Sequence, residues 1–288
     1  MVTGFRYAGN QDFILAELAT GVRPEEKERK KELIAKTEEN MARAGELQEA
    51  LMAESREALV VAIQARDAAG KDSLIRHLFG KLNPNGMEVH SFKTPNSTEL
   101  SHDYLWRISQ ALPARGKIGI FNRSHYEDVL VTRVYRMEEG FRIPERCLTP
   151  DFYERRYRQL RNWEEYLYEN GIRMVKIFLN VGKEAQKTRF LDRMDMKEKH
   201  YKLSLSDLDS RDHWDEFEKA YEDCIKNTGT AIAPWYVVPA DQKWYTRYRV
   251  SEILLATLTE MDPKFPLLSQ AEMEKIPAVR AHLDADDN

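Results

Sequence analysis

Residues 59–73 read LVVAIQARDAAGKDS and carry the strongest fold signal in the chain. The apolar run from Leu59 to Ile63 predicts a buried strand, a loop of small residues follows, and Gly70-Lys71 leads into an amphipathic segment. A strand, a glycine loop, a lysine and a helix in this order are typical of a phosphate-binding P-loop. Small residues let backbone N–H groups approach phosphate oxygens, and the helix N-terminus and the lysine add positive charge.

This loop departs from the usual P-loop pattern, G-x-x-x-x-G-K-[ST], in three places. Ala65 stands at the first glycine, Asp72 replaces the hydroxyl residue that would bind Mg²⁺, and Asp67 adds a carboxylate. We therefore expect phosphoryl chemistry, but not an ordinary ATPase. The loop residues that we expect to bind phosphate are Ala68, Ala69, Gly70, Lys71, Asp72 and Ser73.

Composition indicates one large globular domain with appendages, because the chain has 288 residues, of which 42% are hydrophobic. Two cysteines are too few for a disulfide framework, and neither a signal peptide nor an apolar run of about 18 residues is visible. We therefore expect a soluble, cytoplasmic protein without a membrane partner. Residues 66–136 contain 11 Lys or Arg and 7 Asp or Glu, which fits either a polyanionic ligand or a solvated surface.

Short apolar runs alternate with helix-like segments along the middle of the chain. This alternation predicts an α/β fold, with helices in two layers around a five-stranded parallel sheet. The expected strands are Leu59–Ala65, Met87–Phe92, Ile118–Phe121, Met174–Val181 and Trp235–Pro239. The expected helices are 71–82, 99–111, 125–138, 150–170, 183–194, 207–227 and 242–261.

The chain divides into three parts by sequence character. Residues 1–55 form an N-terminal extension with a long charged helix over 25–55, and residues 56–262 form a P-loop kinase core. A hydrophilic segment at about 187–213 is either a lid over the phosphates or a charged surface helix pair. Residues 263–288 form a tail that we expect to be loosely packed or disordered.

A second polar group follows the strand at 118–121, within IGIFNRSHYEDVLVTR. Ligands of open parallel sheets bind beyond the carboxyl ends of the strands, where Asn122 and Arg123 lie. Asp67 and Asp128 are the candidates for holding Mg²⁺. Considered alone, Asp128 is better explained as an acidic residue that the dipole at a helix N-terminus stabilises. Arg123 and Arg133 are either phosphate clamps or surface ion pairs.

Further cations could extend the phosphate site. Lys93 ends a strand, and Lys81 lies far enough from Lys71 to continue a phosphate track, or it is ordinary surface charge. Arg189 and Arg193 share one face of the segment that could act as a lid. The CxxC, HExxH and G-x-S-x-G patterns are absent, which disfavours zinc and serine-hydrolase chemistry. The aromatic residues fit core packing better than a nucleic-acid platform.

Five blocks in co-linear order resemble the polyphosphate kinase 2 family, over roughly residues 30–262. The blocks are DAAGKDS at 67–73, SFKTP at 91–95, DYLWR at 103–107, PARGKIGIFNRSHYEDVLVTRV at 113–134 and APWYVVPADQKWY at 233–245. The GKDS loop and the IGIFNRS-YEDVLVTR run are most similar to the class III branch. Arg66 departs from the hydrophobic residue typical of that branch.

The resemblance implies a thymidylate-kinase-like core with a helical lid. It also implies transfer between inorganic polyphosphate and AMP or ADP, ending at ATP, with Mg²⁺ or alternatively Mn²⁺, in a homodimer or homotetramer. The family's catalytic residues carry over to Asp67, Lys71, Arg123, Asp128 and Arg133, and its lid arginine to Arg193. The alternatives are an ATP-dependent nucleoside monophosphate kinase and a non-catalytic polyphosphate or nucleotide sensor, which Asp72 would favour.

Overall fold

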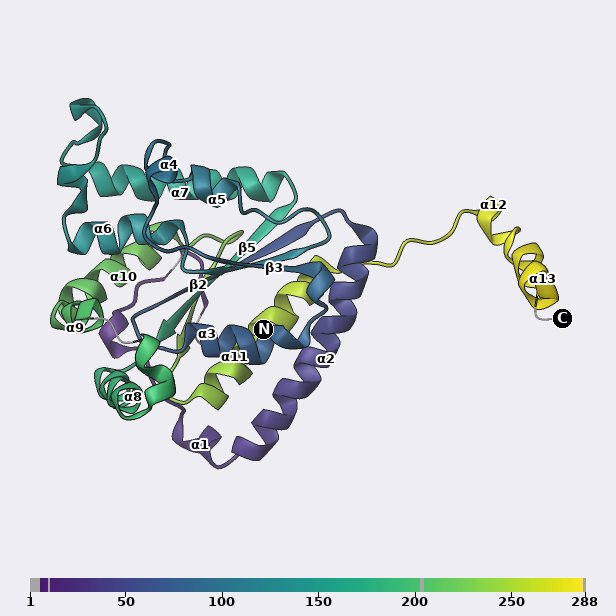
Figure 1. Cartoon of the computed structure of the whole chain (residues 1–288), viewed down its shortest axis with the longest axis horizontal. Helices are drawn as coiled ribbons and strands as arrows, with labels where there is room; N and C mark the ends of the chain where they lie inside the picture. The colour runs from purple at the N-terminus through teal and green to yellow at the C-terminus, as the bar shows by residue number, and fades with distance from the viewer. Residues whose placement is uncertain (1–5, 10, 203–204, 287–288) are drawn as a thin grey trace.

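A computed structural model describes residues 6–9, 11–202 and 205–286 of the chain. A six-stranded sheet with the order β1-β6-β5-β2-β4-β3 lies between two layers of helices (Figure 1). The strands are β1 (Arg6–Tyr7), β2 (Ala58–Ala65), β3 (Met87–Ser91), β4 (Ile118–Asn122), β5 (Ile172–Asn180) and β6 (Trp235–Pro239). The predicted layered α/β fold is confirmed.

Strand β2 occupies the middle of the sheet and is buried along its whole length, because β4 and β5 flank it and helices cover both faces. The neighbouring strands β3, β4, β2, β5 and β6 all run parallel, so their carboxyl ends meet at one edge. The prediction of five strands is wrong by one. The two-residue β1 pairs antiparallel with β6, with Arg6 opposite Tyr236, and a strand this short leaves no periodicity in the sequence.

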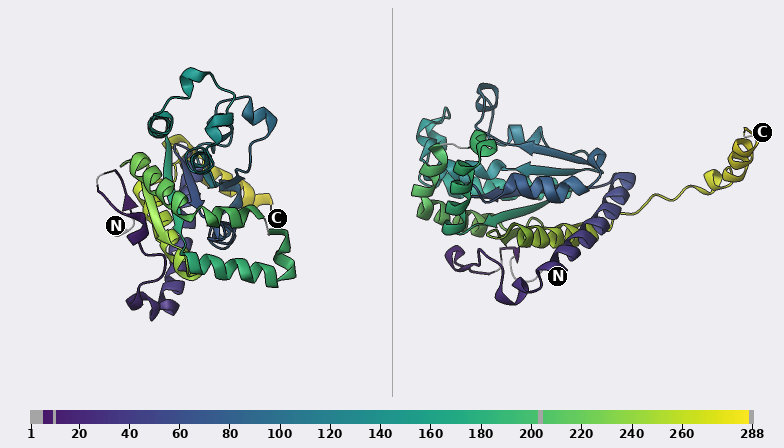
Figure 2. Two further views of the ribbon diagram at one scale, coloured as in Figure 1. Left: turned by 90° about the vertical axis from the view of Figure 1, so that its left-hand side faces the viewer. Right: turned by 60° about the horizontal axis from the view of Figure 1, so that its bottom comes forward.

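Alternate side chains of β2 point into two separate cores, as the pleat of a strand requires. Leu59, Val61 and Ile63 pack with α2 (Lys30–Glu54), α3 (Lys71–Leu78) and α11 (Lys243–Met261). Val60 and Ala62 face the opposite layer, which includes α7 (Phe152–Glu169) and α10 (Trp214–Thr228) (Figure 2). Apolar side chains therefore fill most of the space on both faces of the sheet, and the open polar site lies at its edge.

Several predicted helices are shorter than expected. The other helices are α1 (Pro24–Lys27), α4 (Ser97–Leu100), α5 (Trp106–Ser109), α6 (Val131–Val134), α8 (Lys183–Asp195), α9 (Leu205–Asp212), α12 (Gln270–Met273) and α13 (Ile276–Asp286). The predicted helix 99–111 is broken between α4 and α5, because Asp103 Oδ1 accepts the Leu105 N–H at 2.9 Å and starts a new turn. The predicted helix 207–227 divides at His213 into α9 and α10. The predicted helix 125–138 begins as a 3₁₀ turn, His125–Val129.

The C-terminal tail leaves the domain at the end of α11 and points away from it (Figures 1 and 2). It carries the short helices α12 and α13, with exposed side chains from Lys264 onward in the part that is described. Residues 203–204 of the expected lid segment and 287–288 of the tail lie outside the described residues. Among the helices of the described ranges, we find none with the length and apolar character needed to cross a lipid bilayer.

Candidate functional site

The candidate site lies at the edge of the sheet where β2 and β4 end. The segment Arg66–Gly70 joins β2 to α3, and we call it the phosphate loop. Ala68 (φ 58°) and Gly70 (φ 106°) both have left-handed backbones, which turn the chain sharply before Lys71 begins α3. Left-handed residues in a loop of this kind orient backbone N–H groups into an anion-binding concavity, and a helix N-terminus adds positive potential.

Lys71 folds back along the phosphate loop, and its ammonium group donates to the Ala65 carbonyl at 3.0 Å. Burial lowers the pKa of Lys71, and the nearby Arg123 lowers it further, while Asp67 and Glu127 act in the opposite direction. An anionic ligand placed beside Lys71 would relieve both unfavourable effects, since it supplies the missing negative charge.

Asp67 and Arg123 meet across the ends of β2 and β4. Arg123 Nη2 lies 3.1 Å from Asp67 Oδ1, and the other oxygen, Oδ2, accepts a hydrogen bond from Ser210 of α9 at 3.0 Å. Arg123 has a left-handed backbone (φ 63°), which is unusual for a residue with a side chain. Its N–H donates to the Ile63 carbonyl at 3.0 Å, so the turn after β4 is fixed against β2.

Glu127 also belongs to this group, although it is not among the site residues predicted from the sequence. Its Oε2 lies 3.4 Å from Arg123 Nη1. Gln64 donates to Glu127 Oε1 at 2.7 Å when its side-chain amide is oriented so that both its nitrogen and its oxygen have hydrogen-bond partners. Burial raises the pKa of Glu127, and Arg123 and Lys71 oppose the rise. The spacing of four residues from Arg123 was the available signal. The 3₁₀ turn His125–Val129 presents Glu127 to Arg123.

Asp128 has different neighbours. Burial raises its pKa to about 6, and the cations that oppose the rise are Arg156 and Arg107. Asp67 has its polar contacts with Arg123 and Ser210 instead. The pairing of Asp67 with Asp128 around a metal ion therefore stays a prediction. Within residues 6–9, 11–202 and 205–286, we find no group of three or more His, Cys, Asp or Glu side chains arranged to hold a metal ion.

A small cavity of about 40 Å³ opens beside Asp67, Arg123 and Glu127. Its other walls come from the end of β2 and from α6, α8, α9 and α10. These lining residues are Ala65, Arg66, Val131, Gln186, Ser210, Phe217 and Tyr221. The cavity therefore combines two carboxylates and two guanidinium groups with an apolar wall.

Two of the predicted loop residues have polar partners on other elements. Asn122 donates to Asp72 Oδ1 at 3.0 Å, which links the end of β4 to the first turn of α3. Arg247 of α11 donates to the Ser73 hydroxyl at 3.3 Å. Arg247 was not predicted from the sequence, because only the packing of α11 against α3 brings it to the site.

The remaining predicted cations take different positions. Arg133 is held by Asp223 and by the Tyr157 hydroxyl, each at 2.8 Å, on α10 and α7. Lys81 pairs with Glu38 of α2, which fits the surface-charge interpretation. The Lys93 carbonyl accepts from Arg107 at 2.7 Å. Arg193 lies over the Phe190 ring, 5.4 Å from its centre. Its neighbour Arg189 contacts the phosphate loop directly.

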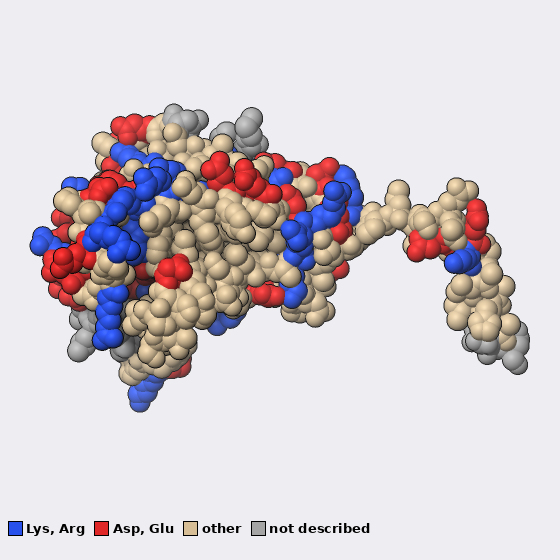
Figure 3. All heavy atoms as spheres, turned by 90° about the horizontal axis from the view of Figure 1, so that it is seen from above, with Lys and Arg blue, Asp and Glu red and all other residues tan. Residues whose placement is uncertain are grey.

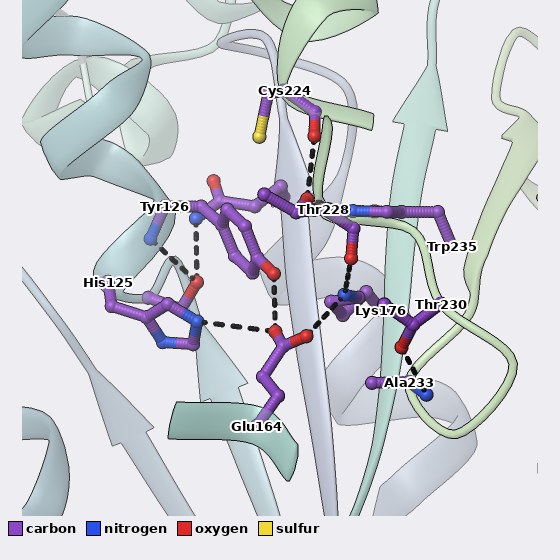
Figure 4. Close-up of polar contacts among 11 residues, drawn as sticks. His125, Tyr126, Glu164, Lys176, Cys224, Thr228, Thr230, Ala233 and Trp235 are labelled. Atoms are coloured by element: carbon purple, nitrogen blue, oxygen red, sulfur yellow. Dashed lines mark hydrogen bonds and ion pairs between the residues drawn. The ribbon is translucent and has the colours of Figure 1, made fainter. Parts of the chain in front are cut away.

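A buried polar network supports the turn that carries Arg123 and Glu127 (Figure 4). Lys176 of β5 lies 2.7 Å from Glu164 Oε2 of α7, and both side chains are at most 1% exposed. Tyr126 donates to Glu164, and His125 Nε2 lies 3.7 Å from the same carboxylate. Burial lowers the pKa of His125, which favours the neutral imidazole. The network joins α7, β5 and the His125–Val129 turn in the interior.

Known proteins resemble the chain over most of its length. The family model described as polyphosphate kinase 2 matches residues 25–266. The ADP-polyphosphate phosphotransferase of Rhodopseudomonas palustris is 41% identical over 283 residues, 97% of each chain. The AMP/ADP-polyphosphate phosphotransferase of Meiothermus ruber is 42% identical over 78% of this chain and 80% of its own. A crystal structure of polyphosphate kinase 2 from Arthrobacter aurescens TC1 superposes with a TM-score of 0.83 at 36% identity, covering 98% of this chain and 99% of that one.

Proposed function

This chain belongs to the polyphosphate kinase 2 family, and we propose that it transfers the terminal phosphoryl group of inorganic polyphosphate to AMP and ADP, forming ADP and ATP reversibly. The observation that carries the proposal is the convergence of Asp67, Arg123 and Glu127 beside the phosphate loop and Lys71. The names of the Rhodopseudomonas and Meiothermus relatives support the donor and the acceptors.

Transfer between these substrates requires two polyanions to approach each other. Phosphoryl transfer depends mainly on positioning and charge neutralisation, with little covalent chemistry by the protein. We propose that Lys71, Arg123 and the N-terminus of α3 offset the repulsion between the two phosphate chains. A band of Lys and Arg side chains crosses the face seen from above, near the end of the molecule opposite the tail (Figure 3). This end carries the carboxyl ends of the strands, which suits a long polyanion.

Asp67 has two roles in this proposal besides metal binding. Its contact with Arg123 positions the guanidinium, and its carboxylate orients the acceptor phosphate. A nucleotide phosphate is already mostly ionised near pH 7, so the acceptor needs no strong base. We therefore weight orientation and metal binding above general-base catalysis at Asp67. Arg133, Lys81, Lys93 and Arg193 remain proposals for outer phosphate contacts.

The residues beside the phosphate loop fit Mg²⁺, with Mn²⁺ as an alternative. Mg²⁺ is bound through oxygen, typically by one or two carboxylates together with substrate phosphates. Asp67 and Glu127 are carboxylates that share Arg123 as a neighbour, so we propose them as ligands and retain Asp128 as the sequence-based alternative. A bound Mg²⁺ would neutralise charge on the phosphates. Asp72, which replaces the usual hydroxyl ligand, accepts from Asn122 instead.

We also propose that the protein works as a homodimer or homotetramer in the cytoplasm. Large apolar side chains on the tail support association, because Leu267 is 94% exposed and Val279 of α13 is 56% exposed. Light scattering on the full chain tests this, and Ile276→Glu with Val279→Glu should lower the measured mass if the tail mediates assembly.

The cytoplasm supplies the nucleotides, and the free thiols of Cys147 and Cys224 fit a reducing compartment.

The proposed function is tested by incubating the protein with AMP, Mg²⁺ and long-chain polyphosphate in the absence of ATP. ADP should form first and ATP afterwards, both in proportion to the enzyme added. Formation of ADP from AMP only when ATP replaces polyphosphate would identify a nucleoside monophosphate kinase. Binding of polyphosphate or nucleotide with no product from either donor would identify a sensor.

A further inference from the structure

Side chains of helix α8 donate hydrogen bonds to three consecutive carbonyls of the phosphate loop. Gln186 Nε2 donates to the Asp67 carbonyl at 3.0 Å. Arg189 Nη1 donates to the carbonyls of Ala68 at 2.9 Å and Ala69 at 2.7 Å. The two side chains are three residues apart, so they share one face of the helix. We call Gln186 and Arg189 the carbonyl clamp.

Arg189 reaches a second loop with its other nitrogen. Its Nη2 donates to the carbonyls of Ala240 at 2.6 Å and Asp241 at 3.0 Å, immediately after β6. One planar guanidinium thus joins the chain beyond β2 to the chain beyond β6. A guanidinium carries five N–H donors in a fixed fork, and only this geometry reaches four carbonyls from two directions. A lysine has one donor atom and cannot reproduce the arrangement.

The orientation of the Gln186 amide is also determined by its surroundings. Arg211 of α9 donates to Gln186 Oε1 at 3.0 Å, which leaves Nε2 as the donor to Asp67. The same Arg211 nitrogen donates to the Lys183 carbonyl at 2.7 Å. Gln186 is 1% exposed, so water does not compete for these contacts. Both members of the carbonyl clamp are therefore held in place before any ligand binds.

The carbonyl clamp determines which way the loop peptides face. In a trans peptide the C=O and the following N–H point in opposite directions, and the chain has no cis peptide among its described residues. Carbonyls of Asp67 and Ala69 that point toward α8 direct the N–H groups of Ala68 and Gly70 away from it. The Ala69 N–H closes a turn on the Arg66 carbonyl at 3.3 Å. The N–H groups of Ala68 and Gly70 are then directed to the side of the loop away from α8, where an anion could accept from them.

This loop needs support from outside because its own sequence favours the conformation poorly. Ala68 adopts a left-handed backbone, φ 58°, that alanine disfavours. The usual first glycine is replaced by Ala65. Strained backbone persists where the surrounding structure over-determines it, and the carbonyl clamp supplies that constraint.

Building on the proposed function, we infer that Gln186 and Arg189 are positioning residues, which hold the phosphate loop in its anion-binding conformation without touching the phosphate. Arg189 thus acts through its donor geometry, whereas a cation that contacts phosphate acts through its charge. The two roles separate in a conservative variant, because Arg189→Lys keeps the charge and loses the fork.

The test compares tripolyphosphate binding by calorimetry and AMP-dependent turnover in wild type, Arg189→Lys, Arg189→Ala and Gln186→Met. Loss of a residue that orients a metal ligand typically costs about 10- to 100-fold, and we take the same scale for a residue that orients a phosphate-binding loop. We expect a loss of this size in tripolyphosphate affinity for both Arg189 variants, a smaller loss for Gln186→Met, and an unchanged KM for AMP. Guanidinium chloride at a few millimolar should partly restore Arg189→Ala. Lys187→Ala removes an exposed cation from the same helix and should match wild type.

Wild-type affinity in Arg189→Lys would overturn the positioning role and indicate that charge alone matters, and wild-type affinity in Gln186→Met would remove Gln186 from the clamp. Melting temperatures identify any variant that fails to fold, and Arg189→Lys and Gln186→Met are the milder changes if Arg189→Ala does. The binding series is independent of turnover. If wild type binds tripolyphosphate but transfers nothing to AMP, the proposed function fails and the binding comparison still decides the positioning role.

Discussion

Replacing Glu164 with glutamine should destabilise the folded chain strongly, because the change leaves a buried ammonium without its counter-charge. Lys176 and Glu164 lie 2.7 Å apart, at 0% and 1% exposure. Burial alone would raise the pKa of Glu164, but Lys176 and His125 lower it below its ordinary value. In the variant, Lys176 keeps its hydrogen bond to the Thr228 carbonyl at 2.7 Å, which carries no full charge, and the burial that lowers the pKa of Lys176 is no longer opposed by Glu164.

The expected size follows from the separation of the charges. Two unit charges at this distance attract each other by about 6 kcal/mol at an effective dielectric constant of about 20. A neutral amide retains part of this attraction, and removing one partner of a buried pair typically costs about 3–5 kcal/mol. We therefore expect the free energy of unfolding to fall by about 3–5 kcal/mol. The melting temperature should fall by roughly 10 °C, since 1 kcal/mol corresponds to about 2–4 °C in domains of this size.

Urea denaturation followed by far-UV circular dichroism measures the change. The matched control is Glu39→Gln, which breaks the Lys36–Glu39 pair on α2, where the side chains are 54% and 66% exposed. That control should change the free energy of unfolding by less than about 1 kcal/mol. The double variant Glu164→Gln with Lys176→Met should recover part of the loss, because no unpaired charge stays buried. A loss in Glu164→Gln no larger than in Glu39→Gln would refute the reasoning.

The remaining predictions concern the site. Asp67→Asn and Lys71→Ala should each lower polyphosphate-dependent turnover at least about 100-fold with an unchanged circular dichroism spectrum, and near-normal turnover would remove the residue from the site. Glu127→Gln should raise the Mg²⁺ concentration for half-maximal rate, whereas Asp128→Asn should not, and the reverse outcome would restore Asp128 as the metal ligand. Burial raises the pKa of Asp128 from 3.8 to about 6, so the folded state binds the proton on this carboxyl more tightly than the unfolded state does. The resulting contribution to the free energy of unfolding is complete below about pH 4 and is lost as the pH rises through 6. The free energy of unfolding of wild type relative to Asp128→Asn should therefore fall between pH 4 and 7 in urea titrations, and a constant or rising difference would contradict the assigned burial.

The layered fold could be predicted because its main signals are local. Trp235–Pro239 was predicted with the same bounds that β6 has, since a run buried on both faces is apolar throughout. The breaks in the helices were harder to predict. Helix α4 stops at Leu100, and the Asp103 side chain starts the turn that leads into α5 through a single hydrogen bond, which helical periodicity does not reveal.

The candidate site was predicted in part for a similar reason. Asp67 and Arg123 both follow a parallel strand, so topology alone brings them together. Which acidic side chain faces Arg123 depends on the 3₁₀ turn at His125–Val129, which orients neighbouring side chains differently from an α-helix, and sequence periodicity did not predict this turn. Arg189 was grouped with Arg193 by helical spacing, but its four carbonyl partners depend on packing between distant segments.

The most direct test of polyphosphate as phosphoryl donor follows the phosphorus itself. Polyphosphate labelled with ³²P is incubated with unlabelled AMP, Mg²⁺ and either wild type or Lys71→Ala, and the products are separated by chromatography. Label should enter ADP first and ATP afterwards with wild type, and should remain in polyphosphate with the variant. Label released only as inorganic phosphate, or nucleotides that stay unlabelled while polyphosphate is consumed, would contradict direct transfer.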